Sequence, residues 1–151
     1  MNINIVCVGN LKEKFWLEAE GEYLKRLQRF CKLSIKEVAE ANKYSDIDKI
    51  LSAEGRQIIE SRSGHCILLD INGKEVSSEE LAKKIESLMQ QTSTITFIIG
   101  GSYGVSDEVK NSVDEKVSFG KITLPHNLAR IVLLEQIYRS FMILSNSKYH
   151  K

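Results

Sequence analysis

Apolar residues along this chain follow two spacings, one typical of buried strands and one typical of helices that lie on a sheet. Four apolar or alternating runs predict strands: Ile3–Val8, Leu33–Ala39, Cys66–Asp70 and Ile95–Ile99. Three segments with apolar residues three or four apart predict helices: Lys14–Phe30, Asp46–Arg62 and Ser77–Gln90. Strands separated by helices of this length imply right-handed crossovers. The pattern therefore predicts an α/β fold, with a mostly parallel sheet flanked by helices.

Polar residues at the predicted boundaries support this division. Ser45 is the expected cap of the second helix, and Ser77 or Ser78 is expected to open the third. The acidic pair Glu79–Glu80 then lies in the first turn, where negative charge suits the helix dipole. Asn72–Gly73, after the third strand, signals a turn.

The last third of the chain places glycine-bearing loops at strand ends. The strand over 94–99 runs directly into Gly100, Gly101 and Gly104, and a second short strand is expected over 118–124. Open parallel sheets bind small molecules beyond the carboxyl ends of their strands, so a ligand site is expected here. The loop lacks the lysine of a P-loop, which argues against a triphosphate and favours a nucleoside held by main-chain groups. A plain strand-to-helix turn explains these glycines equally well.

Pro125, the only proline, fixes its own backbone and keeps Leu124 extended. His126 is thereby presented rigidly at a loop edge, where an imidazole can act as base, acid or hydrogen-bond donor. The alternative is a histidine with only a surface or capping role.

The segment 127–145 predicts a helix that is apolar on almost every side and about 28 Å long. Such a terminal helix needs burial on more than one side, which favours a subunit interface over the alternative of a central helix in one core. Its few polar residues include Glu135 and Arg139, whose spacing of four allows them to pair.

The tail, 147–151, contains Tyr149, His150 and two lysines. Chain ends are commonly disordered. An aromatic ring can nevertheless stack on a base and lysine can meet phosphate, so the tail is also a candidate for half of an RNA site.

Composition narrows the function without naming it. The 151 residues suit one domain, 1–151, and 21 basic against 20 acidic residues give no uniformly positive surface for coating nucleic acid. Three scattered cysteines and the absence of a signal sequence or a spanning apolar stretch predict a soluble, cytoplasmic protein with reduced thiols. No convincing ligand cluster is present, so no metal is expected.

Four segments together carry a family resemblance: Leu68–Lys74, Phe97–Gly104, Leu124–His126 and Asn146–Lys151. They resemble the RlmH family, bacterial SPOUT-class methyltransferases that act on N3 of a pseudouridine in 23S ribosomal RNA, and the resemblance covers the whole chain. It implies a C-terminal trefoil knot, a homodimer and S-adenosyl-L-methionine as the cofactor. It also implies cofactor contacts at Leu69, Gly101, Phe119, Gly120, Lys121, Ile122, Thr123 and Leu124.

Methyl transfer to a base nitrogen requires positioning and a route for the imino proton. We expect His126 and Arg139 to line the acceptor pocket, with Tyr149 and His150 supplied by the partner subunit. The near-neutral charge predicts that the substrate is the assembled ribosome rather than naked RNA. The alternatives are a SPOUT methyltransferase for transfer RNA and a non-catalytic ribosome assembly factor.

Overall fold

The computed structural model describes residues 1–151, in which strands and helices alternate along the chain. The strands are β1 (Asn2–Val8), β2 (Lys32–Val38), β3 (His65–Glu75), β4 (Thr94–Ile99) and β5 (Glu115–Ser118). The helices are α1 (Lys14–Leu27), α2 (Ile47–Ser61), α3 (Ser78–Gln91), α4 (Asp107–Ser112) and α5 (His126–Leu144).

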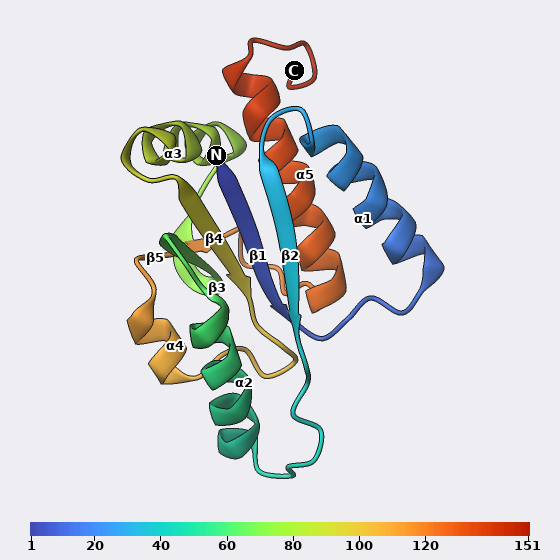
Figure 1. Ribbon diagram of the computed structural model, residues 1–151, viewed down its shortest axis with the longest axis vertical. Helices are drawn as coiled ribbons and strands as arrows, with labels where there is room; N and C mark the ends of the chain where they lie inside the picture. The colour runs from blue at the N-terminus through green and yellow to red at the C-terminus, as the bar shows by residue number, and fades with distance from the viewer.

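The strands form one five-stranded sheet in the order β2-β1-β4-β3-β5, and every ladder is parallel. The predicted α/β architecture is therefore confirmed. Because all strands run the same way, their carboxyl ends meet at a single edge of the sheet. Figure 1 shows that α5 begins near this edge and runs back, so that the chain ends beyond the opposite edge.

Helices cover both faces of the sheet (Figure 1). α1, α3 and α5 pack together on one face, and α2 and α4 pack together on the other. Alternate residues of β1 serve the two sides, since Ile3 and Ile5 join the core under α5 whereas Val6 and Val8 join the core under α2. Burial on both faces explains why the central strands β1 and β4 are mostly apolar, whereas the edge strand β2 alternates apolar and polar residues.

The strand predicted over 118–124 is wrong. β5 ends at Ser118, whose hydroxyl accepts the N–H of Gly120 at 3.1 Å and donates to the carbonyl of Gly120 at 2.8 Å. Gly120 has φ +121°, a conformation that turns the chain out of the ladder and that other residues rarely adopt. Residues 119–124 therefore form a loop.

The turn predicted at Asn72–Gly73 is also wrong, because both residues lie inside β3. The ladder with β5 shifts register between Leu69 and Lys74. A Cβ on Gly73 would lie 2.8 Å from the carbonyl carbon of Lys116, so this glycine permits close strand approach at an irregularity rather than a reversal.

The predicted N-terminal cap is correct for α3 and wrong for α2. Ser77 forms a capping box with Glu80 at the start of α3, as expected. α2 is capped by Asp46, whose carboxylate accepts the N–H of Asp48 at 3.0 Å, instead of by Ser45. α4 was not predicted, because six residues are too few to display a helical period.

The three cysteines are buried and unpaired. Burial raises the pKa of Cys7 to about 12 and that of Cys31 to about 11, so both thiols stay protonated and unreactive near neutral pH. None of the helices combines the length and apolarity needed to cross a membrane.

Candidate active site

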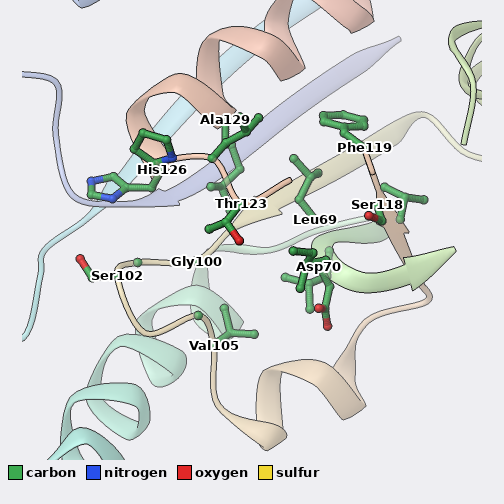
Figure 2. A pocket seen from close by; sticks show the side chains of 18 of the residues that line it. Leu69, Asp70, Gly100, Ser102, Val105, Ser118, Phe119, Thr123, His126 and Ala129 are labelled. Carbon is green, nitrogen blue, oxygen red and sulfur yellow. The ribbon is translucent and has the colours of Figure 1, made fainter. Parts of the chain in front are cut away.

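A cavity of about 700 Å³ lies at the carboxyl edge of the sheet, where β3 and the loops after β4 and β5 meet the start of α5. Figure 2 shows Leu69 and Asp70 on one side, Gly100, Ser102 and Val105 below, and Phe119, Thr123, His126 and Ala129 around the rest. The predicted position of a ligand site is thus matched by a cavity.

The loop after β4 forms the cavity floor through a tight turn. The N–H of Gly104 donates to the carbonyl of Gly101 at 3.0 Å, and Gly104 has φ +81°. A Cβ on Gly101 would lie 3.0 Å from Cγ1 of Val8 and 3.3 Å from Oε1 of Glu54. A side chain at position 101 would therefore crowd the packing behind the loop, which gives this glycine a structural role.

The loop 119–124 supplies the opposite wall. Backbone N–H groups from Lys121 to Leu124 donate to no group within the protein. Exposed main-chain donors of this kind can bond to water, and at the edge of a cavity they can instead hold the polar edge of a flat ligand. The side chain of Ile122 is 82% exposed, which leaves an apolar surface beside the cavity.

His126 is the first residue of α5 and lines the cavity. Its Nε2 lies 4.0 Å from Oε1 of Glu40. Glu54 of α2 is buried nearby; burial is the main cause that raises the pKa of its carboxyl group, and the charge of Glu40 adds to it. The amide of Ala41 donates to Glu54 at 3.1 Å, so the acids help to shape the loops around the imidazole.

A buried cation fixes the start of α5. Arg130 is 1% exposed, and its Nη1 donates to Glu20 at 3.0 Å and to Glu37 at 2.9 Å, while its Nη2 donates to the carbonyl of Gly9 at 3.1 Å. These contacts join α5 to α1, to β2 and to the loop after β1. They place His126, one turn earlier, against the cavity.

The other predicted catalytic residues lie together at the far end of α5. Arg139 donates to Oε1 of Glu135 through Nε at 2.9 Å and through Nη2 at 2.6 Å. The hydroxyl of Tyr149 donates to the same oxygen at 3.1 Å, and Nη1 of Arg139 lies 3.2 Å from Nδ1 of His150. This terminal cluster comprises Glu79, Glu135, Arg139, Tyr149 and His150.

One chain therefore does not bring His126 and the terminal cluster together. His126 and Arg139 are thirteen positions apart on one helix, a separation of about 20 Å. Within the chain the tail folds back on its own α5.

Seven of the eight expected cofactor residues line the cavity, and only Lys121 does not. Sequence reasoning missed Tyr103 and Ala129 as cavity residues, and it missed Glu79 in the terminal cluster. Tyr103 could have been predicted as a cavity residue, because it lies between two glycines of the loop after β4. No local signal marks Glu79, because its partner lies 71 positions away. No group of three or more His, Cys, Asp or Glu side chains is placed to hold a metal ion.

Comparisons with known proteins find chains that are described as methyltransferases. A family model described as "Predicted SPOUT methyltransferase" matches residues 1–150. The chain is 48% identical over 159 residues to a protein of Lactobacillus acidophilus named "Ribosomal RNA large subunit methyltransferase H", with all of both chains covered. It is 47% identical over 155 residues to a protein of the same name from Fusobacterium nucleatum, again over all of both chains.

A solved structure described as "a probable methylase family protein from Haemophilus influenzae" has a TM-score of 0.55 and 13% identity, over 99% of this chain and 70% of that one. This likeness concerns the fold alone. The family model and the full-length relatives are decisive together: the chain belongs to the SPOUT methyltransferase family.

Proposed function

We propose that this protein is a homodimeric, S-adenosylmethionine-dependent methyltransferase that modifies N3 of a pseudouridine in 23S ribosomal RNA on assembled ribosomes. The observation that carries the proposal is the cavity at the carboxyl edge of the sheet, walled by a glycine turn and by a loop with free main-chain donors. Full-length relatives named as large-subunit ribosomal RNA methyltransferases support the same substrate class.

The residues of the cavity suit the proposed cofactor. Apolar side chains of Leu69, Phe119 and Leu124 offer surfaces for a flat adenine, and the free N–H groups at 121–124 offer donors to its ring nitrogens or ribose. The volume of about 700 Å³ is ample for a nucleoside with an amino-acid arm. S-adenosylmethionine would supply a methyl group bound to a positively charged sulfur, open to attack by a nitrogen.

For the acceptor, the protein has to orient a base and assist the loss of its N3 proton. His126 lines the cavity and can hydrogen-bond the base or take part in proton transfer. Arg139 carries a fixed positive charge suited to stabilising the anion that forms as the imino proton leaves. We assign both residues to the acceptor side, together with Tyr149 and His150.

A homodimer would unite these groups. Three exposed apolar side chains, Ile71, Tyr103 and Ile122, border the cavity, and such an apolar rim favours a covering partner. On α5, Leu128, Val132 and Met142 are only partly covered within one chain. If α5 of a second copy packs across this rim, the terminal cluster of one subunit faces the cavity of the other, which removes the 20 Å separation.

The substrate form follows from charge. With 21 basic and 20 acidic residues, one subunit has too little net positive charge to select a nucleotide in naked RNA through electrostatics. Shape recognition of an assembled ribosome replaces that attraction in our proposal.

The test is transfer of tritiated methyl from S-adenosylmethionine to ribosomes that lack their native modification, with purified ribosomal RNA and transfer RNA alongside. Label confined to ribosomes, recovered as N3-methylpseudouridine after nuclease digestion, is the expected result. Label in transfer RNA would replace the proposal with the transfer RNA alternative. Cofactor binding without label in any RNA would favour the non-catalytic assembly factor.

A further inference from the structure

The imidazole of His150 lies between two groups whose hydrogen-bonding roles are fixed. Nη1 of Arg139 is 3.2 Å from Nδ1, and Oε1 of Glu79 is 2.8 Å from Nε2 (both within one chain). A guanidinium can only donate, and an ionised carboxylate can only accept. Nδ1 therefore carries the lone pair and Nε2 carries the hydrogen.

Other contacts of the terminal cluster hold the neighbouring tail residue. Tyr149 donates to Glu135 at 3.1 Å, and its ring lies 4.8 Å from Cζ of Arg139 and 5.0 Å from the ring of Tyr138. All of these partners belong to α5. Glu79, in the first turn of α3, is the one member of the terminal cluster outside α5 and the tail.

We infer that Glu79 is a positioning residue that, with Arg139, holds His150 as its Nε2–H tautomer and docks the tail on α5 before any RNA binds. The hydrogen bond from His150 is also the main cause that lowers the pKa of the Glu79 carboxyl group, so Glu79 is ionised and able to accept at neutral pH. The side chain of Glu79 is 57% exposed, which means that its effect is modest and lies in orientation.

This arrangement limits what His150 can do. Its only lone pair faces the guanidinium of Arg139, so a docked His150 cannot accept a proton from the substrate. His150 then orders the tail rather than acting as the base. The consequence for RNA binding rests on the proposed function, whereas the tautomer and the docking do not.

The direct test is nitrogen-15 NMR of the histidine side chains in the full-length protein without RNA. The chain has three histidines, and a His150→Gln variant assigns the signal of interest. We expect the wild-type spectrum to report the Nε2–H tautomer at neutral pH. Glu79→Ala should move this signal toward the tautomer mixture of a free imidazole, because only the contact with Arg139 then remains, and Glu79→Asp should largely keep the wild-type signal.

Glu86→Ala is the matched control, because Glu86 is an exposed acid on the same helix and has no hydrogen-bond or ion-pair partner. Glu86→Ala should leave the His150 signal unchanged. A wild-type Nδ1–H tautomer or free-imidazole mixture would overturn the inference, and so would a Glu79→Ala signal identical to that of Glu86→Ala.

Kinetics on ribosomes give the second readout. Glu79→Ala should raise KM for the ribosome by about two- to fivefold, the range expected for an exposed ion pair, with kcat and cofactor affinity unchanged. Glu79→Asp should restore most of the loss. A fall in kcat at constant KM would contradict a pre-docking role. If the tautomer is as expected but no ribosome is methylated, the proposed function fails while the docking stands.

Discussion

Single residues decide the shape of the cavity. Gly101 lies where β1, α2 and the turn after β4 converge, and a Cβ at this position would lie only 3.0 Å from the side chain of Val8 and 3.3 Å from that of Glu54. Arg130 plays the corresponding role for α5, since three acceptors from distant segments meet on one buried guanidinium. Gly101 lines the cavity and was singled out from the glycine loop, whereas Arg130 acts from behind the cavity, and its role could not be read from residue type.

Gly101→Val should weaken cofactor binding about tenfold or more, because the added side chain clashes with Val8 and Glu54 and displaces the turn. Isothermal titration with S-adenosylmethionine measures the effect. Gly21→Ala is the control: a Cβ there meets nothing within 4 Å, and alanine in a helix adds up to about 1 kcal/mol of stability. Unchanged affinity in Gly101→Val would contradict a role for this turn in binding.

Arg130→Met should lower the free energy of unfolding by about 3 kcal/mol, because Glu20 and Glu37 are left without their shared cation. The value is at the low end for a buried pair, since Glu37 is 42% exposed. Urea denaturation gives the comparison with Lys14→Ala, which removes an exposed ion pair and should change stability by less than about 1 kcal/mol. Equal losses of stability in the two variants would show that the buried ion pairs of Arg130 contribute no more than an exposed ion pair.

Elements are set by local signals at their ends and by distant contacts along their sides. The start of α3 was predicted correctly from Ser77, Ser78 and the acidic pair after them. A capping box involves only four consecutive residues, so it can be recognised from local sequence. At the start of α2 the sequence favoured Ser45 as the cap, whereas the structure has Asp46 in that position. β5 could not be located from its residues, since it is only four residues long and the loop after it is more apolar than the strand itself.

Asp46→Ala should cost about 1 kcal/mol of unfolding free energy, because the N–H of Asp48 loses its acceptor at the start of α2. Ser45→Ala should change stability by no more than about 0.5 kcal/mol, as expected for a surface position without such a contact. Thermal unfolding of the two variants side by side distinguishes the caps. A larger loss of stability in Ser45→Ala than in Asp46→Ala would show that Ser45 is the cap, as the sequence predicted.

The edge strand β5 should be pH-sensitive through Glu115. Burial raises the pKa of this carboxyl group, but hydrogen bonds from Lys84 and His65 outweigh it and hold the pKa below its ordinary value. A lowered pKa adds stability that is present above the ordinary glutamate value of about 4.3 and lost as pH falls through the lower folded value.

Thermal midpoints of the wild type and Glu115→Gln, measured from pH 7 down to pH 3, check this expectation. The wild type should be the more stable protein at neutral pH, and the difference should shrink as pH falls below about 4.3. A constant difference would show that the carboxylate charge does not contribute.

At the scale of the whole molecule, the two regions to which we assign function lie at opposite ends of α5. The cavity and His126 are at the carboxyl edge of the sheet, and the terminal cluster lies beyond the other edge (Figure 1). Within one chain, Tyr149 and His150 cannot contact a base that lies beside His126. A second copy of the chain is the simplest arrangement that would bring them together. The family also implies a trefoil knot at this end of the chain.

Removing residues after Asn146 should reduce methylation of ribosomes about tenfold or more, because Tyr149 and His150 are lost from the acceptor side. Cofactor affinity should persist, since the residues that line the cavity all precede the tail and the tail is assigned to the acceptor. A chain lacking only Lys151 serves as the control and should keep its activity, because that residue makes no polar contact with the protein. Normal methylation by the shorter chain would remove the tail from the proposed site.

By itself the sequence determined the α/β class and the approximate position of most elements, and it predicted a ligand site at the edge after β4, where the structure has a cavity. These depend on apolar period, caps and glycine turns, which are properties of neighbouring residues. Only the tertiary structure decided the strand order, the place of Gly73 within β3, the burial of Arg130 and the meeting of Glu79 with His150. These contacts join residues that are tens of positions apart. A local sequence pattern does not indicate which distant residue will pack against it in the folded chain.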